Sequence, residues 1–577
     1  MTTRTNVADR LTNIAGQMPR AMAVVSARRG RCSACTFGEL ESDADALARG
    51  LIDLGVRPGH RLVLLVKPGV EFVKLVFALL RTGATTVLVD PGMGRQYLIN
   101  CLAAAEPDGF IAISAAQAAR VAYRRRFPRA TLNITVGRRW FWSGVTYSQL
   151  LKRGRSSTVA LPNTSAHDPA AIIFTSGSTG PPKGVLYTHR MFDTQASEIQ
   201  RAYDLQPGGV DLSCFALFGL FNSAWGVTTV FPEMDFSRPA SADPEKLLAA
   251  ATRWQVTQAF ASPAVWDKLS RHGELTGQVI PTLRKVFSCG APVPATVLER
   301  TLQMVHPEAE MHTPYGATEA LPVATIEARE VLNETATKTN QGAGVCVGRT
   351  FDTVEWRIIR ITDAPIATIG DAEELPMGEV GELIVRGPQV SSKYMEARWT
   401  GRLSDQSAAE STSQLAADAN TLAKIRDGNA VWHRMGDVGY VDEQERFWYC
   451  GRKSQRVATA SETLFTECCE AVFNQHPAVR RCALVSSGDD RAPTIVVELH
   501  DSSNGRGHSW PAVRRQLQAL AEAHPHTRQV DRFLLHQSLP VDVRHNAKIN
   551  REQLDEWATK QVQLEPGGDG PRPLAGG

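Results

Sequence analysis

Little in the sequence indicates secretion or membrane insertion. Ten cysteines are scattered over 577 residues, a usage typical of a reducing cytoplasm rather than of a disulfide framework. The most apolar stretch, residues 62–89, is interrupted by charged side chains, and no apolar run reaches the roughly 18 residues that a membrane-spanning helix needs. Residues 1–11 show no apolar segment of a secretory signal.

An excess of charge of one sign is also lacking. The chain has 63 Lys and Arg against 60 Asp and Glu, a formal net charge of +3, whereas a nucleic-acid-binding protein usually carries a basic patch or stripe. The arginine-rich stretch at 120–129 is short and is interpreted as a solvated face. We therefore expect a cytoplasmic protein with no nucleic-acid partner and no transmembrane segment.

What the sequence does have is a repeated alternation of strands and helices. Short apolar runs at 62–66, 86–89, 171–174 and 285–288 are each followed by turn residues and a longer amphipathic segment. This pattern predicts an α/β fold with largely parallel sheets up to about residue 340. Short strands with Gly and Pro turns at 377–395 predict a small antiparallel or barrel-like subdomain.

Length and composition divide the chain into parts. At 577 residues it is too long for one ordinary core. We expect an N-terminal domain at 1–451 and a C-terminal domain at 452–562. The polar segment at about 401–430 is interpreted as a surface insertion or flexible loop, and the Gly- and Pro-rich tail 563–577 predicts disorder.

The strongest chemical signal lies at residues 171–188, which read AIIFTSGSTGPPKGVLYT. An apolar strand enters a loop rich in glycine and hydroxyl side chains, with a lysine near its end. Such a loop suits a polyphosphate, because glycines let backbone N–H groups approach an anion while hydroxyls and the lysine add donors and charge. Taken alone, it could equally be an ordinary Ser/Gly surface loop. The residues concerned are Thr175, Ser176, Gly177, Ser178, Thr179, Gly180 and Lys183.

The string TSGSTGPPKG resembles the phosphate loop of the adenylate-forming superfamily of acyl-CoA synthetases, luciferases and peptide-synthetase adenylation domains. Further signatures of the superfamily follow in order, so the resemblance covers roughly residues 20–555. It implies a large N-terminal lobe of parallel-rich sheets with helices and a small barrel-like subdomain, followed by a small mobile α+β C-terminal lobe. It also implies ATP and magnesium (Mg²⁺) as cofactors and an acyl-adenylate intermediate.

The resemblance assigns a role to each matching residue. Residues 315–319, YGATE, match an element in which Tyr315 packs on adenine, Thr318 meets the phosphate and Glu319 helps to hold Mg²⁺, and Gly316 is counted with the nucleotide-binding residues. The backbone that flanks adenine is matched by Gly290, Ala291 and Pro292.

Three more matches complete the set. Asp437 and Arg452 match the ribose contacts, Ser454 matches the hinge between the lobes, and Lys548 matches the catalytic lysine. Such a lysine would offset charge in the transition state when a carboxylate attacks the α-phosphate of ATP, and closure of the small lobe would deliver it.

Further segments, among them 215–221 (FALFGLF), 225–230 (WGVTTV) and 543–548 (VRHNAK), closely resemble those of the olefin-pathway β-lactone synthetases. In that subgroup a long-chain 2-alkyl-3-hydroxyalkanoic acid is adenylated, and its own hydroxyl then attacks the activated carbonyl. The segment 457–465, VATASETLF, contains no glycine, which weakens the case for a narrow passage for a pantetheine thiol. An apolar pocket for two alkyl chains would use Phe215, Phe218, Phe221 and Trp225.

Several alternatives stay open. The phenylalanines spaced by three could be a helix face in the core, and His312 and His545 could assist proton transfer or be ordinary structural histidines. A long-chain fatty acyl-CoA synthetase or fatty acyl-AMP ligase is the second hypothesis, and a non-catalytic nucleotide-binding protein is the third. A complex with other enzymes of hydrocarbon synthesis would fit the first hypothesis.

Overall fold

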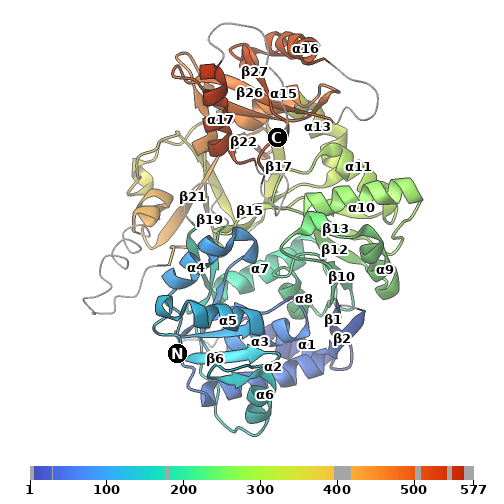
Figure 1. Ribbon diagram of the computed structural model, residues 1–577, viewed down its shortest axis with the longest axis vertical. Helices are drawn as coiled ribbons and strands as arrows, with labels where there is room; N and C mark the ends of the chain where they lie inside the picture. Colours follow the sequence, from blue (N-terminus) through green and yellow to red (C-terminus); the bar gives the residue numbers. More distant parts are fainter. Residues whose placement is uncertain are drawn as a thin grey trace.

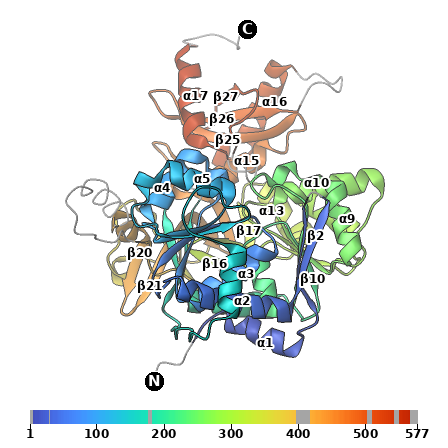
Figure 2. The same ribbon diagram turned by 60° about the horizontal axis from the view of Figure 1, so that its bottom comes forward.

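The computed structural model describes residues 5–28, 30–175, 182–395, 417–500, 509–541 and 549–564. Two seven-stranded sheets and an antiparallel sheet form its larger part, and a three-stranded sheet belongs to a smaller C-terminal lobe. In both views this lobe lies at one end of the molecule (Figures 1 and 2). Both the α/β fold and the large and small lobes were expected from the sequence.

One seven-stranded sheet has the order β7-β6-β5-β3-β4-β8-β9, and its strands are parallel except for the antiparallel pair β8–β9. Runs such as Arg61–Leu65 and Gly109–Ile113 are apolar almost throughout, as is typical of parallel strands buried on both faces. The strands are β3 (Arg61–Leu65), β4 (Thr85–Leu88), β5 (Gly109–Ile113), β6 (Leu132–Val136), β7 (Val145–Thr146), β8 (Pro169–Phe174) and β9 (Gly184–Thr188).

The other seven-stranded sheet has the order β14-β13-β12-β10-β11-β1-β2, parallel except for the hairpin β1–β2. Its strands are β1 (Met22–Arg28), β2 (Arg31–Thr36), β10 (Val210–Ser213), β11 (Thr228–Phe231), β12 (Gln258–Ala261), β13 (Lys285–Ser288) and β14 (Glu310–His312). Helices α1 (Asp9–Gln17), α8 (Gly219–Trp225), α9 (Pro244–Trp254), α10 (Pro263–Thr276) and α11 (Ala295–Met304) accompany this sheet, whereas α7 (His189–Ala202) follows β9 and contacts both β9 and α8.

Helices α2 (Phe37–Asp53) and α3 (Val70–Arg81) join the two sheets into one core. Helix α3 is buried at every position except Glu71. Its apolar side chains share a cluster with Val24 and Phe231 of one sheet and Leu62 of the other. Helices α4 (Arg95–Ala104), α5 (Ser114–Ala122) and α6 (Tyr147–Arg155) belong to the sheet that contains Leu62, which runs from β7 to β9. The carboxyl ends of both sets of parallel strands therefore border one region between the sheets, where α/β proteins bind ligands.

An antiparallel sheet comes next, and it is one of the two forms, antiparallel or barrel-like, that the sequence predicted for this subdomain. It has the order β15-β16-β17-β22-β21-β19-β18, and β20 pairs with β21. Its strands are β15 (Tyr315–Ala317), β16 (Ala320–Thr325), β17 (Val345–Thr350), β18 (Glu355–Ile359), β19 (Gly381–Arg386), β20 (Lys424–Asp427), β21 (Ala430–Val441) and β22 (Phe447–Arg452).

The smaller lobe contains a sheet of order β25-β26-β27. Its elements are the hairpin β23 (Val457–Ala458) and β24 (Thr463–Leu464), strands β25 (Val479–Ser487), β26 (Ala492–Leu499) and β27 (Arg532–Leu535), and helices α15 (Thr466–Phe473), α16 (Trp510–Ala523) and α17 (Arg551–Leu564). At the junction, Gly451 has φ +139°, and a Cβ there would lie 2.3 Å from Thr466 Oγ1. Only glycine fits this crossing from β22 to α15.

Two expectations about irregular segments need correction. Residues 417–423 of the expected polar insertion are helical and residues 424–427 form β20, because Ala419 and Ile425 are buried in the core. The first two residues of the expected disordered tail, 563 and 564, belong to α17. Residues 401–416 and 565–577 lie outside the described part of the chain. Within that part, no helix combines the length and hydropathy needed to cross a bilayer.

Candidate active site

The two ends of the phosphate-binding loop are held together by a narrow hairpin neck. Strands β8 and β9 are antiparallel, and beyond them the Thr175 N–H donates to the Lys183 carbonyl at 3.0 Å. In return the Lys183 N–H donates to Thr175 Oγ1 at 3.2 Å. Five of the sequence-predicted residues, Ser176 to Gly180, lie outside the described residues.

The hairpin β15–β16 carries Thr318 and Glu319 to the same region. The Tyr187 hydroxyl of β9 donates to the Thr318 carbonyl at 2.6 Å, so the strand leaving the phosphate loop also positions this hairpin. The Tyr394 hydroxyl donates to Glu319 Oε1 at 2.8 Å. Gly316 is required within the hairpin, because a Cβ there would lie 2.6 Å from the Ala320 carbonyl.

The expected ribose ligands face each other across two strands. Asp437 of β21 and Arg452 of β22 are Cα partners in the sheet, and Arg452 Nη1 lies 2.9 Å from Asp437 Oδ1. The Tyr315 hydroxyl donates to the other carboxylate oxygen of Asp437. The Asp437 charge raises the pKa of Arg452, and burial together with that same charge raises the pKa of Tyr315. A charged Asp437–Arg452 pair and a neutral phenol follow.

The adenine segment and the hinge also border this region. Gly290 follows β13 with φ +99° and lines the cavity, while Ala291 and Pro292 come next in the turn. Ser454 is exposed at the centre of the 3₁₀ turn Lys453–Gln455 and lines the opposite side of the cavity. Lys548, the expected catalytic lysine, lies outside the described residues, as does His545.

Besides Lys183, the site contains a second lysine, Lys424, which the sequence analysis did not identify. Its Nζ lies 5.2 Å from the centre of the Tyr394 ring, the same distance as Lys183 Nζ, and it donates to the Ser391 carbonyl at 2.5 Å. Burial lowers the pKa of Lys424 to about 7, although the Glu319 carboxylate acts in the opposite direction. The residue lies in the segment that the sequence assigned to an insertion, so only its position next to the aromatic ring could have drawn attention to it.

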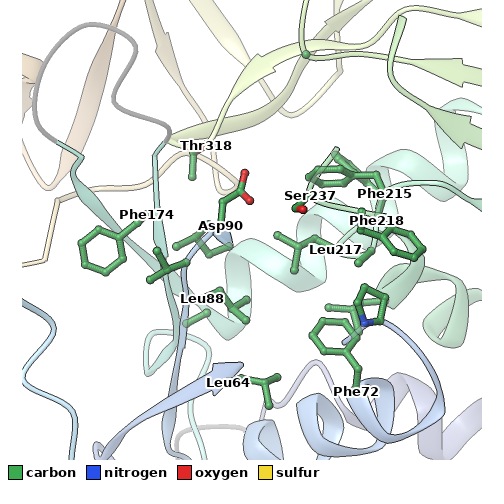
Figure 3. Close-up of a pocket in the computed structure, with 18 of the residues that line it drawn as sticks. Leu64, Phe72, Leu88, Asp90, Phe174, Phe215, Leu217, Phe218, Ser237 and Thr318 are labelled. Atoms are coloured by element: carbon green, nitrogen blue, oxygen red, sulfur yellow. The ribbon is translucent and has the colours of Figure 1, made fainter. Parts of the chain in front are cut away.

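A continuous cavity of about 2310 Å³ extends from this polar end into the space between the two large sheets. Drug-sized ligand pockets are usually about 300–1,000 Å³, so the cavity can hold a large substrate beside a nucleotide. Figure 3 shows apolar side chains from both sheets facing the same space, with Thr318 at one end. These include Leu64, Phe72, Leu88, Phe174, Phe215, Leu217 and Phe218.

Three of the four expected acyl-pocket residues line the cavity, and the fourth does not. Phe215, Phe218 and Phe221 are half-buried and contribute to the wall. Trp225 instead lies behind Phe221 in the core. Its ring stacks on Phe221 at a centroid distance of 5.7 Å, and its indole N–H donates to the Ala196 carbonyl at 2.8 Å. Trp225 lies one turn after Phe221 on the same face of α8, and at this point along the helix that face meets α7 instead of the cavity.

Asp90 places a carboxylate on the wall of the cavity, among the apolar side chains that Figure 3 shows. It follows β4, accepts from the Gly92 N–H at 2.9 Å and lies near Ser237 in Figure 3. The Ser237 carbonyl would lie 3.5 Å from a Cβ on Gly92, so loops from the two sheets meet here. The sequence analysis did not single out Asp90, although its place after a parallel strand was a usable signal.

His312 has a different environment from the one considered in the sequence. Its ring lies 4.7 Å from Tyr203 and 6.1 Å from Phe287, and its Nε2 is 3.1 Å from Glu310 Oε2. Burial lowers the pKa of His312. It is a neutral, structural histidine beside β13 and β14 and has no access to the cavity lining.

The donor set at Glu319 fits Mg²⁺. Carboxylate and hydroxyl oxygens are the ligands this ion prefers, and it commonly uses one or two carboxylates together with phosphate oxygens and water. Glu319 and Thr318 both line the cavity beside Lys183. Among the described residues there is no cluster of three or more His, Cys, Asp or Glu that could hold a metal ion.

The fold and the site define an adenylate-forming enzyme. A family model described as "AMP-binding enzyme" matches residues 11–395, and the chain belongs to this family. Its fold is shared by the anthranilate CoA ligase AuaEII in complex with anthranoyl-AMP, with a TM-score of 0.74 at 18% identity over 98% of this chain and 99% of that one. The amide bond synthetase McbA from Marinactinospora thermotolerans has a TM-score of 0.73 at 21% identity over 96% of this chain and 100% of that one.

Two curated relatives are much more similar in sequence. The chain is 44% identical to the olefin beta-lactone synthetase of Xanthomonas campestris pv. campestris over 97% of this chain and 99% of that protein. It is 43% identical to the olefin beta-lactone synthetase of Stenotrophomonas maltophilia over the same shares of the two chains. Relatives named as CoA ligases, such as the 4-chlorobenzoate–CoA ligase of an Arthrobacter species, are 24% identical over 84% of this chain and 83% of theirs.

Proposed function

We propose that the protein activates a long-chain 2-alkyl-3-hydroxyalkanoic acid with ATP and closes it to a β-lactone, releasing pyrophosphate and AMP. The observation that carries this proposal is the single cavity that joins Thr318 and Glu319 to a large, mostly apolar chamber, with the Asp90 carboxylate on its wall. Two alkyl chains would fill the chamber, while the acid would lie at its polar end. The names of the two full-length relatives agree with this reaction.

In the first step, a carboxylate oxygen of the acid bonds to the α-phosphorus of ATP, and the bond from that phosphorus to pyrophosphate breaks. Lys183, Lys424 and Lys548 would offset the negative charge that gathers there. Asp437 would bind the ribose hydroxyls, held in place by Arg452. When bound at Glu319, Mg²⁺ would supply further charge neutralisation on the phosphates.

In the second step, the 3-hydroxyl oxygen bonds to the acyl carbon, and the bond from that carbon to AMP breaks. The hydroxyl proton must leave, and we assign its acceptor as the Asp90 carboxylate. The hydroxyl is already part of the bound acyl chain, so proximity favours ring closure over attack by an outside nucleophile. The cavity wall would exclude water, which otherwise hydrolyses the adenylate.

The hairpin β23–β24 supports an internal acceptor rather than a thiol. Its turn is closed by side chains, with Thr459 Oγ1 donating to the Glu462 carbonyl at 2.9 Å and the Gln529 amide donating to Ser461 Oγ. No glycine opens the turn. A long-chain acyl-CoA synthetase or fatty acyl-AMP ligase is the second candidate, favoured by the relatives named as CoA ligases.

Product analysis with and without coenzyme A tests the proposal. The purified enzyme is incubated with ATP, Mg²⁺ and a 3-hydroxy acid, and lactone, AMP and pyrophosphate are measured. We expect equal lactone yields in both reactions. An acyl-CoA product, or turnover only when coenzyme A is present, would overturn the lactone proposal in favour of the second candidate.

Substitution of Asp90 separates the two steps. Asp90→Asn keeps the size of the side chain and removes the base, so we expect pyrophosphate release in the first turnover to persist while lactone formation falls about 100-fold or more. Lys548→Ala is the control, because it should abolish pyrophosphate release itself. Unchanged lactone formation in Asp90→Asn would show that another group accepts the proton.

Localisation, partners and domain organisation are proposed together with this function. An enzyme of this kind would work in the cytoplasm, and its apolar product would favour transfer within a complex of hydrocarbon-pathway enzymes. A domain boundary at 451 and a mobile C-terminal lobe hinged at Ser454 are part of the same hypothesis.

A further inference from the structure

The loop that follows β6 presents two aromatic side chains to solvent. Residues 137–144 read GRRWFWSG, and this stretch is named the aromatic tip. Trp140 is 54% exposed and Phe141 is 82% exposed. Large aromatic side chains gain much free energy when removed from water, so two adjacent exposed rings at a loop tip mark a contact surface.

A packed base holds the aromatic tip in place. Trp142 is buried, and its indole N–H donates to Thr135 Oγ1 at 2.9 Å. The Trp142 ring lies 5.3 Å from that of Trp140 and 5.5 Å from that of Phe141. The Ser114 hydroxyl donates to the Arg138 carbonyl at 2.5 Å. The two exposed rings are therefore presented outward by a structured loop.

Positive charge accompanies the exposed rings. Arg138 and Arg139 directly precede Trp140 and are both exposed. From residue 109 to residue 167 the sequence contains ten Lys and Arg and no Asp or Glu. Tryptophan beside arginine is suited to the headgroup region of a bilayer, and anionic lipids attract the arginines. A narrow convex tip also offers little of the area that a stable protein interface needs.

The acyl cavity reaches the base of the aromatic tip. Gly137, the first residue of the loop, lines the cavity together with Val136 of β6, Ile113 of β5 and Ala116 of α5. One end of the apolar chamber therefore lies next to the element that carries the exposed rings. The other end lies at Thr318 and Glu319.

We propose that the aromatic tip docks the enzyme on an anionic lipid bilayer and sets the adjacent end of the cavity against the membrane. Trp140 and Phe141 enter the headgroup region, and Arg138 and Arg139 pair with lipid phosphates. A dialkyl acid then passes from the bilayer into the chamber without crossing water. The docking itself rests on the tip, whereas the passage of substrate rests on the proposed function.

Vesicle flotation of the full-length enzyme tests the docking. Vesicles of phosphatidylcholine with phosphatidylglycerol are expected to carry the enzyme upward in a density gradient, while pure phosphatidylcholine vesicles carry much less. The double substitution Trp140→Ser with Phe141→Ser should lower vesicle affinity about tenfold or more. Arg138→Ser with Arg139→Ser should lower it about fivefold for each arginine at low salt.

Two matched variants serve as controls. Leu275→Ser removes an 85% exposed apolar side chain from α10, in the other half of the large lobe. Arg124→Ser with Arg125→Ser removes the same charge as the arginine variant, but from the turn after α5. Because α5 runs back along β5 and β6, that turn lies at the opposite end of the strands. Both controls should float within about twofold of wild type.

The outcomes distinguish docking from its alternatives and from the proposed function. The docking proposal would be wrong if the wild-type enzyme did not float with anionic vesicles, or if the tip variants floated as well as the wild type. Loss of self-association or of a co-purifying protein in the tip variants, with no vesicle binding by wild type, would make the tip a protein contact and the proposal wrong. Activity on detergent-dispersed acid should survive in the tip variants. Flotation without lactone formation would overturn the proposed function alone.

Discussion

At the scale of single residues, the site contains several basic side chains, and only some of them could be predicted from the sequence. Lys183 could be predicted because it stands in a recognisable loop. Lys424 could not, because the segment around it reads as polar and aperiodic, and its role depends on Tyr394, 30 positions earlier in the chain. Asp90 escaped notice for a related reason, since a carboxylate after a strand gains meaning only when a second sheet closes over it.

Lys424→Met should weaken ATP-dependent turnover. Removing one partly screened charge near the phosphates is worth about 1.4 kcal/mol, so we expect the KM for ATP to rise about tenfold. Lys393→Met, at an exposed position close to Tyr394, is the matched control and should change KM less than twofold. Steady-state pyrophosphate release measures both. Equal effects of the two substitutions on the KM for ATP would show that Lys424 has no specific role in ATP binding.

The same substitution should stabilise the fold, and by more at lower pH. An unfolded lysine has a pKa near 10.5, whereas burial lowers that of folded Lys424 to about 7. Between these values the unfolded chain binds more protons, so the cost of Lys424 is full below pH 7 and disappears as the pH rises toward 10.5. We expect Lys424→Met to raise Tm by about 2 °C or more at pH 6.5 and by little at pH 9.5. A Tm gain that is equal at both pH values would contradict the lowered pKa.

At the scale of elements, strand β21 connects a buried ion pair to the nucleotide site. Arg434 and Asp437 lie three residues apart on this strand. The Arg434 guanidinium contacts Glu382 of β19 at 2.6 Å with both side chains almost fully buried, and Lys453, beside the hinge, lies 3.1 Å from the same carboxylate. The pair therefore fixes the strand that presents Asp437, the aspartate proposed to bind the ribose.

Arg434→Met should cost about 3 kcal/mol of unfolding free energy, because it leaves the Glu382 carboxylate buried without its main partner. Chemical denaturation measures this cost. The double variant Arg434→Met with Glu382→Leu should recover most of it, since neither charge is then buried alone. A double variant no more stable than the single one would show that the arginine acts through packing instead.

At the scale of the whole molecule, the active site exists only because separate sheets meet. Alternating strands and helices could be predicted from sequence, as could the adenylation residues that stand in local motifs. The cavity could not, because it is enclosed by strand ends and helices from residues far apart in the chain, and no local pattern records how they pack. Trp225 shows the limit: the three phenylalanines before it line the cavity, whereas one further turn of the same helix places its ring in the core.

Cavity length should set the chain length of the acid. Ala116 on α5 is half-buried and lines the far end of the cavity, while Ala119, one turn later, is exposed. Ala116→Trp should shorten the chamber by about two methylene groups and lower kcat/KM for the longest accepted acids about tenfold, leaving shorter acids unchanged. Ala119→Trp should have no such effect. Measuring kcat/KM for a series of acids of increasing chain length with both variants tests this expectation. If kcat/KM depended on chain length in the same way in both variants, the alkyl chains would not extend to Ala116.

The junction between the lobes carries a practical consequence for protein engineering. Gly451 ends the large lobe, and the hydroxyl of Thr466, on the first helix of the small lobe, occupies the space that any side chain at 451 would need. A chimaera made by exchanging small lobes after Arg452 inherits these two positions from different parents. Such a graft is expected to fold only when its recipient keeps glycine at this crossing, whichever residue the donor brings to face it. Compatibility can therefore be screened from one letter of sequence, the residue at position 451, before any gene is made.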